Sequence, residues 1–359
     1  MRLLMTADAV GGVWSYALDL ARGLAARGVE VTLAVLGPAP DAAEAIPGVE
    51  VRVTGLPLDW LADTPDQVMQ AGDAVAALAV RIGADVVHLN SPALAVARFA
   101  QPVLGACHSC LATWWDAVRG GALPADFAWR TDLLARGYAR CDALVAPTHA
   151  FAAATARTYA LARPPRVVHN GRRAGPRGDR MADFAFTAGR LWDEGKDLAT
   201  LDRAAARLDV PVLAAGPARG PNGAEAALPN LRLLGHLDPQ ALRGWLARGP
   251  VFVSAARYEP FGLAVLEAAQ AGCALVLSDI GTFREVWDGA AVFAPPGEDE
   301  GFARAVAALV RDRERRAQLR VAALERARRY TADAMVEGVH AIHRDLLAGT
   351  GMRTGKAAA

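Results

Sequence analysis

The sequence predicts an α/β protein of two domains, each built on an open parallel sheet. Short apolar runs alternate with longer segments of helical period along the whole chain, which is typical of parallel strands covered by helices on both faces. The chain has 359 residues, more than one hydrophobic core usually fills. A stretch rich in Gly, Pro and Arg between Asn170 and Met181 is typical of a linker. Because such sheets bind ligands beyond the carboxyl ends of their strands, we expect the active site in a cleft that two facing sheets enclose.

Each expected strand is a short apolar run bounded by turn-forming residues. In the first domain these runs cover residues 2–7, 31–37, 49–55, 84–90, 102–107, 143–148 and 166–171. In the second domain they cover residues 184–189, 210–216, 230–235, 250–255, 274–279 and 290–295. Helices are expected between the strands.

The last part of the chain is expected to be helical from about residue 297. A buried face is indicated by the spacing of Met335, Val339, Ile342 and Leu346, and the final residues are small and polar, which is typical of a tail without fixed structure. The expected limits are 1–172 for the first domain, 181–328 for the second, 329–348 for a last helix and 349–359 for a disordered tail.

Composition excludes several classes of function. The formal net charge is +1, from 39 basic and 38 acidic residues, so no overall field favours a nucleic acid or an anionic membrane. The start of the chain has too short an apolar stretch for a signal peptide, and no apolar run reaches the roughly 18 residues of a membrane helix. Four cysteines are too few for a disulfide framework and fit a reducing compartment. We therefore expect a cytoplasmic protein with free thiols and no integral membrane segment.

Two carboxylates, Glu259 and Glu267, stand in the stretch RYEPFGLAVLEAAQAG. A proline and a glycine ahead of the apolar helical pattern predict a helix that begins near Gly262. The backbone amides of Phe261, Gly262 and Leu263 would then point outward at the positive end of the helix dipole, which binds phosphate without a metal. Glu267 lies in the apolar run, where a carboxylate is costly unless a donor such as a sugar hydroxyl meets it. The alternative is a solvated helix face with an ordinary loop acid.

A second pattern, FTAGRLWDEGKDLATL, places Arg190 and Lys196 after a strand that ends at Gly189. A guanidinium and an ammonium at the carboxyl end of a strand suit a diphosphate, which they would neutralise as Mg²⁺ does elsewhere. In the alternative interpretation these cations pair with the neighbouring acids Asp193, Glu194 and Asp197.

Gly11 and Gly12 lie between the first expected strand and the first expected helix. Without side chains, they let the backbone approach a ligand closely, although a tight turn explains them equally well. The segment is not a GxGxxG fingerprint, so a dinucleotide cofactor is not indicated.

In this order and at this spacing, the three patterns resemble family 4 of the retaining glycosyltransferases, the group 1 type with the GT-B fold. The resemblance implies two Rossmann-like domains that face across a cleft, with a C-terminal helix that crosses back to the first domain. It covers nearly the whole chain. The segments that carry it are VVHLN (86–90), the segment around His108, CDALVAPT (141–148), VVHNG (167–171), GRL with its following lysine, EPFGLAVLEA and TFREVWDGAAVFAPPG (282–297).

The resemblance also implies roles for individual residues. Arg190 and Lys196 would bind the donor diphosphate, and Glu267 the ribose hydroxyls. Glu259 would hold the transferred sugar together with the amides of residues 261–263. Gly12 would border the diphosphate and the acceptor, and His108 would face the donor sugar from the other domain.

Three departures from the family pattern stand out. Lys196 follows Arg190 by six residues instead of five, because Gly195 intervenes. Ala274 replaces a common proline, and Gln270 replaces a small residue, and neither change removes a functional group.

The function implied is a metal-independent hexosyltransferase that retains the anomeric configuration and needs no cofactor. The donor would be a UDP-, GDP- or ADP-linked sugar, and the acceptor an unidentified carbohydrate, lipid or small molecule. Two alternatives are a nucleotide-sugar epimerase and a nucleotide-sugar binding protein without turnover.

The CxxC of Cys107 to Cys110 lacks a second pair of ligands, so a metal or redox centre is not expected there. Trp114 and Trp115 suit either the core or a platform for an acceptor sugar.

Overall fold

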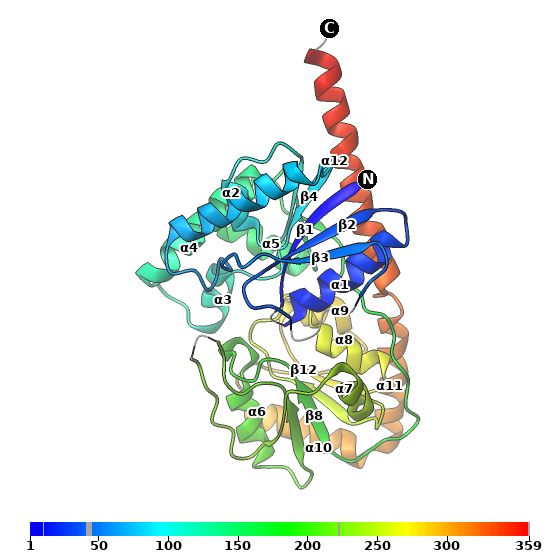
Figure 1. Cartoon of the computed structure of the whole chain (residues 1–359). Coiled ribbons are helices and arrows are strands. Elements are labelled where there is room, and N and C mark those ends of the chain that lie inside the picture. Colours follow the sequence, from blue (N-terminus) through cyan, green and yellow to red (C-terminus); the bar gives the residue numbers. More distant parts are fainter. Residues whose placement is uncertain (10, 41–44, 222, 358–359) are drawn as a thin grey trace. The chain divides into compact units, whose positions relative to one another are not determined.

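The computed structural model describes residues 1–9, 11–40, 45–221 and 223–357, with only the backbone described from residue 350 (Figure 1). The chain divides into two compact units. Unit 1 comprises Met1–Asp116, Gly120–Asn170 and the segment from Ala332 onward, and unit 2 comprises Ala117–Arg119 and Gly171–Thr331. Unit 1 is thus assembled from both ends of the sequence, whereas unit 2 is almost one continuous segment.

The described part of unit 1 contains a seven-stranded parallel sheet of order β3-β2-β1-β4-β5-β6-β7. Strand β1, the third in this order, pairs on both sides, so that Leu3 lies opposite Val31 in β2 and Val86 in β4. The chain therefore runs outward from β1 in both directions, as βαβ connections produce. The strands are β1 (Arg2–Asp8), β2 (Glu30–Leu36), β3 (Val49–Val53), β4 (Val86–Leu89), β5 (Val103–Ala106), β6 (Ala143–Ala146) and β7 (Arg166–Val167).

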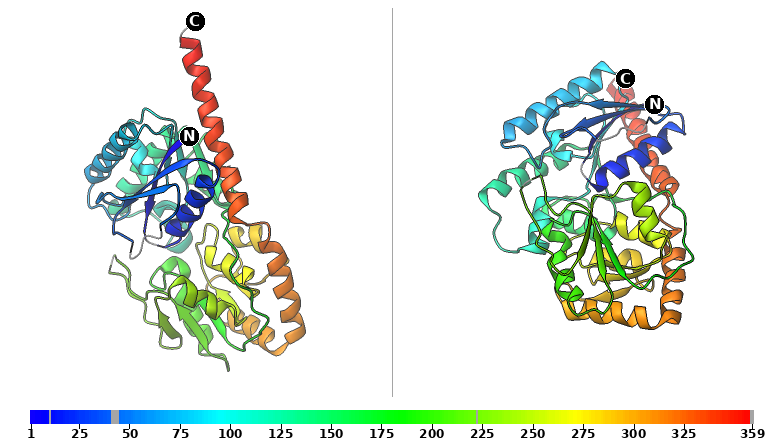
Figure 2. Two further views of the ribbon diagram at one scale, coloured as in Figure 1. Left: turned by 45° about the vertical axis from the view of Figure 1, so that its right-hand side comes forward. Right: turned by 60° about the horizontal axis from the view of Figure 1, so that its bottom comes forward.

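Helices cover both faces of this sheet, and each face has its own apolar core. One core joins the sheet to α1 (Gly12–Ala25) and α12 (Ala332–Ala357), and the other joins it to α2 (Pro65–Arg81) and the 3-10 helix η1 (Pro92–Val96). Helix α12 lies beside α1 in both views of Figure 2. The two helices approach closely because α1 has Gly23 at the contact, where a Cβ would lie 2.4 Å from Cγ2 of Val336. The remaining helices of this unit are α3 (Leu111–Val118), α4 (Ala125–Arg140) and α5 (His149–Thr158).

The described part of unit 2 contains a six-stranded parallel sheet of order β10-β9-β8-β11-β12-β13, again with helices on both faces. Its strands are β8 (Ala185–Ala188), β9 (Val212–Ala215), β10 (Arg232–Gly235), β11 (Val251–Ser254), β12 (Ala274–Ser278) and β13 (Val292–Ala294). Its helices are η2 (Glu194–Lys196), α6 (Leu198–Ala205), α7 (Pro239–Leu246), α8 (Leu263–Gln270), α9 (Gly281–Trp287), α10 (Asp299–Arg311) and α11 (Arg313–Ala327).

The structure confirms the predicted α/β class, and every predicted strand overlaps an observed one. Residues 173–180 form neither helix nor strand, as expected of the linker. The end of the chain differs from the expectation of a disordered tail, because α12 continues to Ala357 with no proline to stop it. The last two residues of that expected tail, 358 and 359, lie outside the described residues. Among the described helices, none is long and apolar enough to cross a lipid bilayer.

Candidate functional site

The candidate site in unit 2 lies where β8 and β11 end. These strands are neighbours, and their parallel register pairs Ala185 with Val251. The loop after β8 carries Gly189, Arg190 and η2, and the loop after β11 leads through Glu259 to α8. Because both strands run in the same direction, both loops emerge at the same edge of the sheet.

Three of the predicted cationic and acidic residues line one cavity in unit 2, namely Arg190, Lys196 and Glu259. Its polar walls also include Thr187 and Ser254 at the strand ends. The other lining residues are Ala188, Gly189, Leu191, Leu198, Phe252, Ala255, Ala264 and Val265. The sequence separates these residues by up to 78 positions, yet the two loops bring the charged groups to one hollow.

Lys196 and Glu259 form an ion pair across that cavity. The ammonium Nζ lies 2.6 Å from Oε2 of Glu259, and each side chain keeps about a fifth of its surface exposed, at 20% and 19%. The alternative pairing of Lys196 with the acids beside it in sequence is therefore not what the structure has. Arg190 does follow that alternative, since its Nη2 lies 2.8 Å from Oδ2 of Asp193. In the cavity, Arg190 is thus paired with Asp193, close to it in sequence. Lys196 is paired with Glu259, the residue expected to hold the transferred sugar.

Helix α8 begins at Leu263, so the predicted helix start near Gly262 is confirmed. Gly262 has φ 92°, a left-handed conformation that glycine adopts without strain, and a Cβ there would lie 2.9 Å from Cε1 of Phe283. The ring of Phe261 is buried against Tyr330, with 5.7 Å between ring centroids, so only its backbone is left to contact a ligand. The first amides of α8 have no partner within the helix and form its positive end.

Glu267 lies on α8 but does not line the cavity. Its Oε1 accepts a hydrogen bond of 2.7 Å from Nε of Arg172, in the segment that the sequence identifies only as linker. Gln270, one turn further along α8, donates from Nε2 to the carbonyl of Arg172 over 3.1 Å and holds that segment in place. In this structure the guanidinium of Arg172 therefore compensates the carboxylate of Glu267.

In unit 1 the predicted residues lie near the carboxyl ends of β1 and β5. Gly11, with φ 81°, is the N-cap of α1, which begins at Gly12. His108 follows β5, its ring centroid lies 4.5 Å from that of Tyr16, and its Nε2 lies 2.7 Å from Oδ1 of Asn90. Since Nδ2 of Asn90 donates to the carbonyl of Thr6 over 2.6 Å, Oδ1 of that amide faces His108 as the acceptor.

The charge state of His108 follows from its surroundings. Burial lowers its pKa to about 4, so the imidazole is neutral at pH 7. With Nε2 donating to Asn90, the other nitrogen, Nδ1, is left as an acceptor.

The cysteines and tryptophans singled out in the sequence have structural surroundings. Cys107 and Cys110 are buried free thiols, and burial raises the pKa of both, which makes them unreactive. In the described part of the chain, no group of three or more His, Cys, Asp or Glu side chains is placed to hold a metal ion. Trp115 is half-buried and meets Phe127 edge to face at 5.5 Å between ring centroids. Packing within unit 1 thus accounts for this tryptophan.

Comparison with known proteins decides the family. Residues 10–173 match the family model described as Glycosyltransferase Family 4, and residues 183–312 match the one described as Glycosyl transferases group 1. The chain belongs to the family 4, group 1 glycosyltransferases. The sequence resemblance to this family is therefore confirmed, and the enzyme class favours sugar transfer over the epimerase and the binding-protein alternatives.

Solved glycosyltransferases share the fold. Sucrose-phosphate synthase from Thermosynechococcus elongatus aligns over 97% of this chain and 100% of its own, with a TM-score of 0.83 and 18% identity. WaaG, a glycosyltransferase involved in lipopolysaccharide biosynthesis, aligns over 95% and 99% with a TM-score of 0.71 and 14% identity. The Anabaena protein HepE in complex with UDP-glucose aligns over 96% and 100% with a TM-score of 0.69 and 17% identity. These similarities establish the GT-B fold.

One curated relative has a local match of higher identity. A glycogen synthase from Mycobacterium tuberculosis is 43% identical over 83 residues, which is 23% of this chain. The matched stretch is only 20% of that relative. The match therefore supports the family and leaves the substrate to be established.

Proposed function

We propose that this glycosyltransferase transfers a hexose from a nucleotide diphosphate sugar to an acceptor hydroxyl, with retention of the anomeric configuration and without a metal ion. The observation that carries the proposal is the cavity of unit 2, where Arg190, Lys196 and Glu259 meet beside the start of α8. Two cations and the positive end of a helix form an environment that favours a diphosphate.

The proposed donor contacts follow the chemistry of each group. Arg190 and Lys196 bind the diphosphate, with Gly189 leaving room for the backbone to approach it. Glu259 and the amides of residues 261–263 hold the transferred sugar, and Glu267 accepts hydrogen bonds from the ribose. Lys196 would then share its three donor hydrogens between Glu259 and a phosphate oxygen.

Catalysis in this proposal is mainly electrostatic. As the bond to the diphosphate breaks, Arg190, Lys196 and the start of α8 stabilise the negative charge that develops on the leaving group. The acceptor hydroxyl attacks the face that the nucleotide leaves, and the departing phosphate oxygen takes its proton. Glu259 orients the sugar and is not assigned as a nucleophile. The roles of Gly11, Gly12 and neutral His108 in holding donor and acceptor rest on the family resemblance.

The first test is a thermal-shift screen with UDP, GDP, ADP and their glucose conjugates, because a ligand of the folded state raises the melting temperature. UDP is the first candidate, since solved neighbours are complexes with UDP and UDP-glucose. The best donor is then incubated with candidate acceptors, and nucleotide release and the anomer of the product are measured. Isomerised sugar from donor alone, or inversion of the anomer, would contradict the proposal.

Metal independence is tested in the same assay. A strong chelator is expected to leave the transfer rate unchanged, because the charge of the diphosphate is met by Arg190 and Lys196. Loss of activity that Mn²⁺ restores would overturn this part. We further propose a cytoplasmic location, because the free, mostly buried cysteines fit a reducing compartment.

A further inference from the structure

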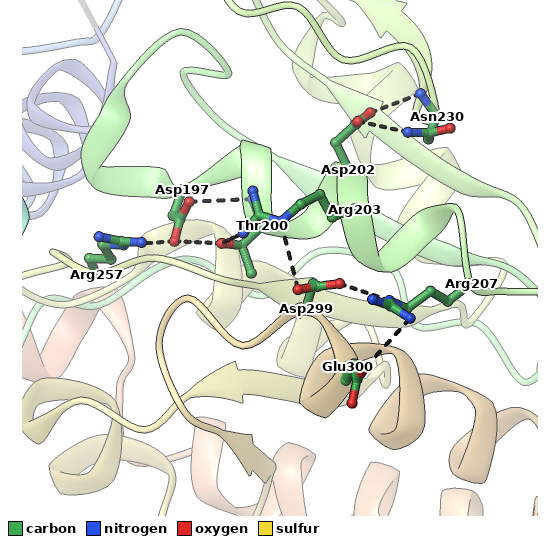
Figure 3. A network of polar contacts seen from close by, with 9 residues as sticks. All are labelled: Asp197, Thr200, Asp202, Arg203, Arg207, Asn230, Arg257, Asp299 and Glu300. Atoms are coloured by element: carbon green, nitrogen blue, oxygen red, sulfur yellow. Dashed lines mark hydrogen bonds and ion pairs between the residues drawn. The ribbon is translucent and has the colours of Figure 1, made fainter.

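The loop that carries Lys196 is fixed by a second ion pair directly beside it, between the buried carboxylate of Asp197 and the guanidinium of Arg257. Asp197 follows Lys196 and has φ 48° and ψ 47°, a left-handed conformation that a residue other than glycine rarely adopts. Such a conformation costs about 1 kcal/mol or more and persists only where the surroundings enforce it. The contacts that enforce it are drawn in Figure 3.

The carboxylate of Asp197 is fully engaged within unit 2. Oδ2 accepts from Nε of Arg257 and from Oγ1 of Thr200, each over 2.8 Å, and Oδ1 accepts from the amide of Thr200 over 3.3 Å. Only 9% of the Asp197 side chain is exposed. Because both oxygens of this buried carboxylate are bonded within unit 2, it acts on the site through other groups and does not need to contact a substrate.

Arg257 connects this pair to the second loop of the site, two residues before Glu259. The amides of Arg257 and Tyr258 both donate to the carbonyl of Gly195, over 2.9 and 3.1 Å. Gly195 is the residue that makes the spacing from Arg190 to Lys196 six instead of five. Its carbonyl therefore joins the two loops. These bonds and the Arg257–Asp197 pair lie on either side of Lys196 in sequence.

We propose that Asp197 and Arg257 are positioning residues, which fix Nζ of Lys196 against Glu259 before the donor arrives. The inference rests on the proposed role of Lys196 at the donor diphosphate. The bond between Asp197 and Arg257 holds the two loops together and so keeps the ammonium of Lys196 in place. It does so without using any of the hydrogen bonds that Lys196 itself can donate. When either partner is lost, the bond that links the two loops is lost and Lys196 leaves the position that stabilises the leaving group.

The test uses Asp197→Asn and Arg257→Gln, assayed with saturating acceptor and varied donor. Asparagine tolerates the left-handed conformation and still accepts from Thr200, so Asp197→Asn removes mainly the charge that Arg257 meets. We expect kcat/KM for the donor to fall by about a hundredfold in each variant, as a displacement of about 1 Å of a catalytic group produces. The double variant is expected to lose no more than either single variant, because both changes break one device.

Arg207→Gln is the matched control. Its guanidinium makes the same kind of bond, Nε to Oδ2 of Asp299 over 2.8 Å, at the far end of the polar network in Figure 3. This variant should keep kcat/KM for the donor. If Asp197→Asn does not fold, Arg257→Gln still tests the proposal, because the Arg257 side chain is 41% exposed and its loss leaves no cavity in the core.

The outcomes separate the inference from the proposed function. If Lys196→Met retains full transfer, the role of Lys196 fails, and the positioning role fails with it. If Lys196→Met is inactive while Asp197→Asn and Arg257→Gln match Arg207→Gln in kcat/KM, only the positioning inference is overturned. Each variant is also assayed at the same number of degrees below its own melting temperature. If the loss of kcat/KM disappears under that condition, the Asp197–Arg257 pair only stabilises the fold, and the positioning inference is overturned.

Discussion

Arg172 donates from Nε to Oε1 of Glu267 over 2.7 Å, which ties the segment after Asn170 to the second turn of helix α8. Both side chains are largely buried, with 19% and 26% of their surfaces exposed. A carboxylate among apolar neighbours needs such a partner, because burying an uncompensated charge is costly. The pair therefore explains how Glu267 is tolerated on an apolar helix, and since Arg172 bonds to Oε1, we propose that Oε2 makes the ribose contact.

The ribose role of Glu267 predicts a difference between two substitutions. Glu267→Ala should lower kcat/KM for the donor by about 10- to 100-fold, since a hydrogen bond to a charged group contributes about 1.5–3 kcal/mol. Arg172→Gln should lower it less, because the carboxylate remains. Steady-state kinetics with varied donor, together with nucleotide affinity by calorimetry, measure both. Equal losses in the two variants would mean that the pair is only structural.

The leaving-group role of Lys196 predicts an effect on turnover. Lys196→Met should lower kcat by about 10²- to 10³-fold, the range found when one preorganised donor is removed from a developing charge. Lys196→Arg keeps the charge and should retain more activity than Lys196→Met. Rapid-quench measurement of the transfer step separates this effect from product release. Unchanged kcat in Lys196→Met would contradict the assignment.

Buried histidines in unit 1 predict a loss of stability in acid. His88 and His343 share a hydrogen bond of 3.2 Å between Nδ1 and Nε2, and neither is exposed. Burial lowers the pKa of His343 to about 3, and burial with the neighbouring His343 and His108 lowers that of His88. In the unfolded chain these histidines have a pKa near 6.5, so as the pH falls they take up protons before the folded histidines do. The free energy of unfolding is therefore at its full value above that pH and decreases below it.

The size of this effect can be measured. When the pH is lowered from 8 to 5.5, each of the two histidines should lower the free energy of unfolding by about 1.4 kcal/mol. Denaturant unfolding at several pH values, followed by a signal from unit 1, measures it. His343→Gln should reduce the dependence on pH between 8 and 5. A stability of unit 1 that rises as the pH falls through 6 would contradict the assignment.

A close backbone contact at the site predicts the effect of one methyl group. Gly216 has φ 135°, and a Cβ there would lie 1.8 Å from the carbonyl oxygen of Gly189, next to Arg190. Gly216→Ala should destabilise unit 2 by more than about 2 kcal/mol, because strain and overpacking add. Gly244→Ala on α7, where nothing lies within 4 Å of the new Cβ, is the control and should be neutral or stabilising. Calorimetry distinguishes the two.

The fold was predictable because each strand is a compact apolar run that both faces of a parallel sheet bury, as in LVLSD and its neighbours. The start of α8 was also predictable, because Pro260 and Gly262 mark the beginning of a helix through their own backbone preferences and need no distant partner. Arg172, Asp197 and Arg257 were not recognised, because their partners lie 60 or more positions away and no periodicity marks them. From the sequence, only the acids next to Lys196 were expected as its partners in the protein, and the pair with Glu259, 63 positions away, was not predicted. Tertiary packing makes that choice.

The double origin of unit 1 sets an order of events during synthesis on the ribosome. Its core beside α1 contains Met335, Val336, Val339 and Ile342 together with Tyr16 and Leu20, so this core is incomplete until residues 335–342 have been translated. Unit 2 consists almost entirely of residues 171–331 and has all its own apolar surface before that moment. Unit 1 begins to be translated before unit 2 but can complete its folding only after it, and the face of nascent helix α1 that contacts α12 stays uncovered until α12 has been made.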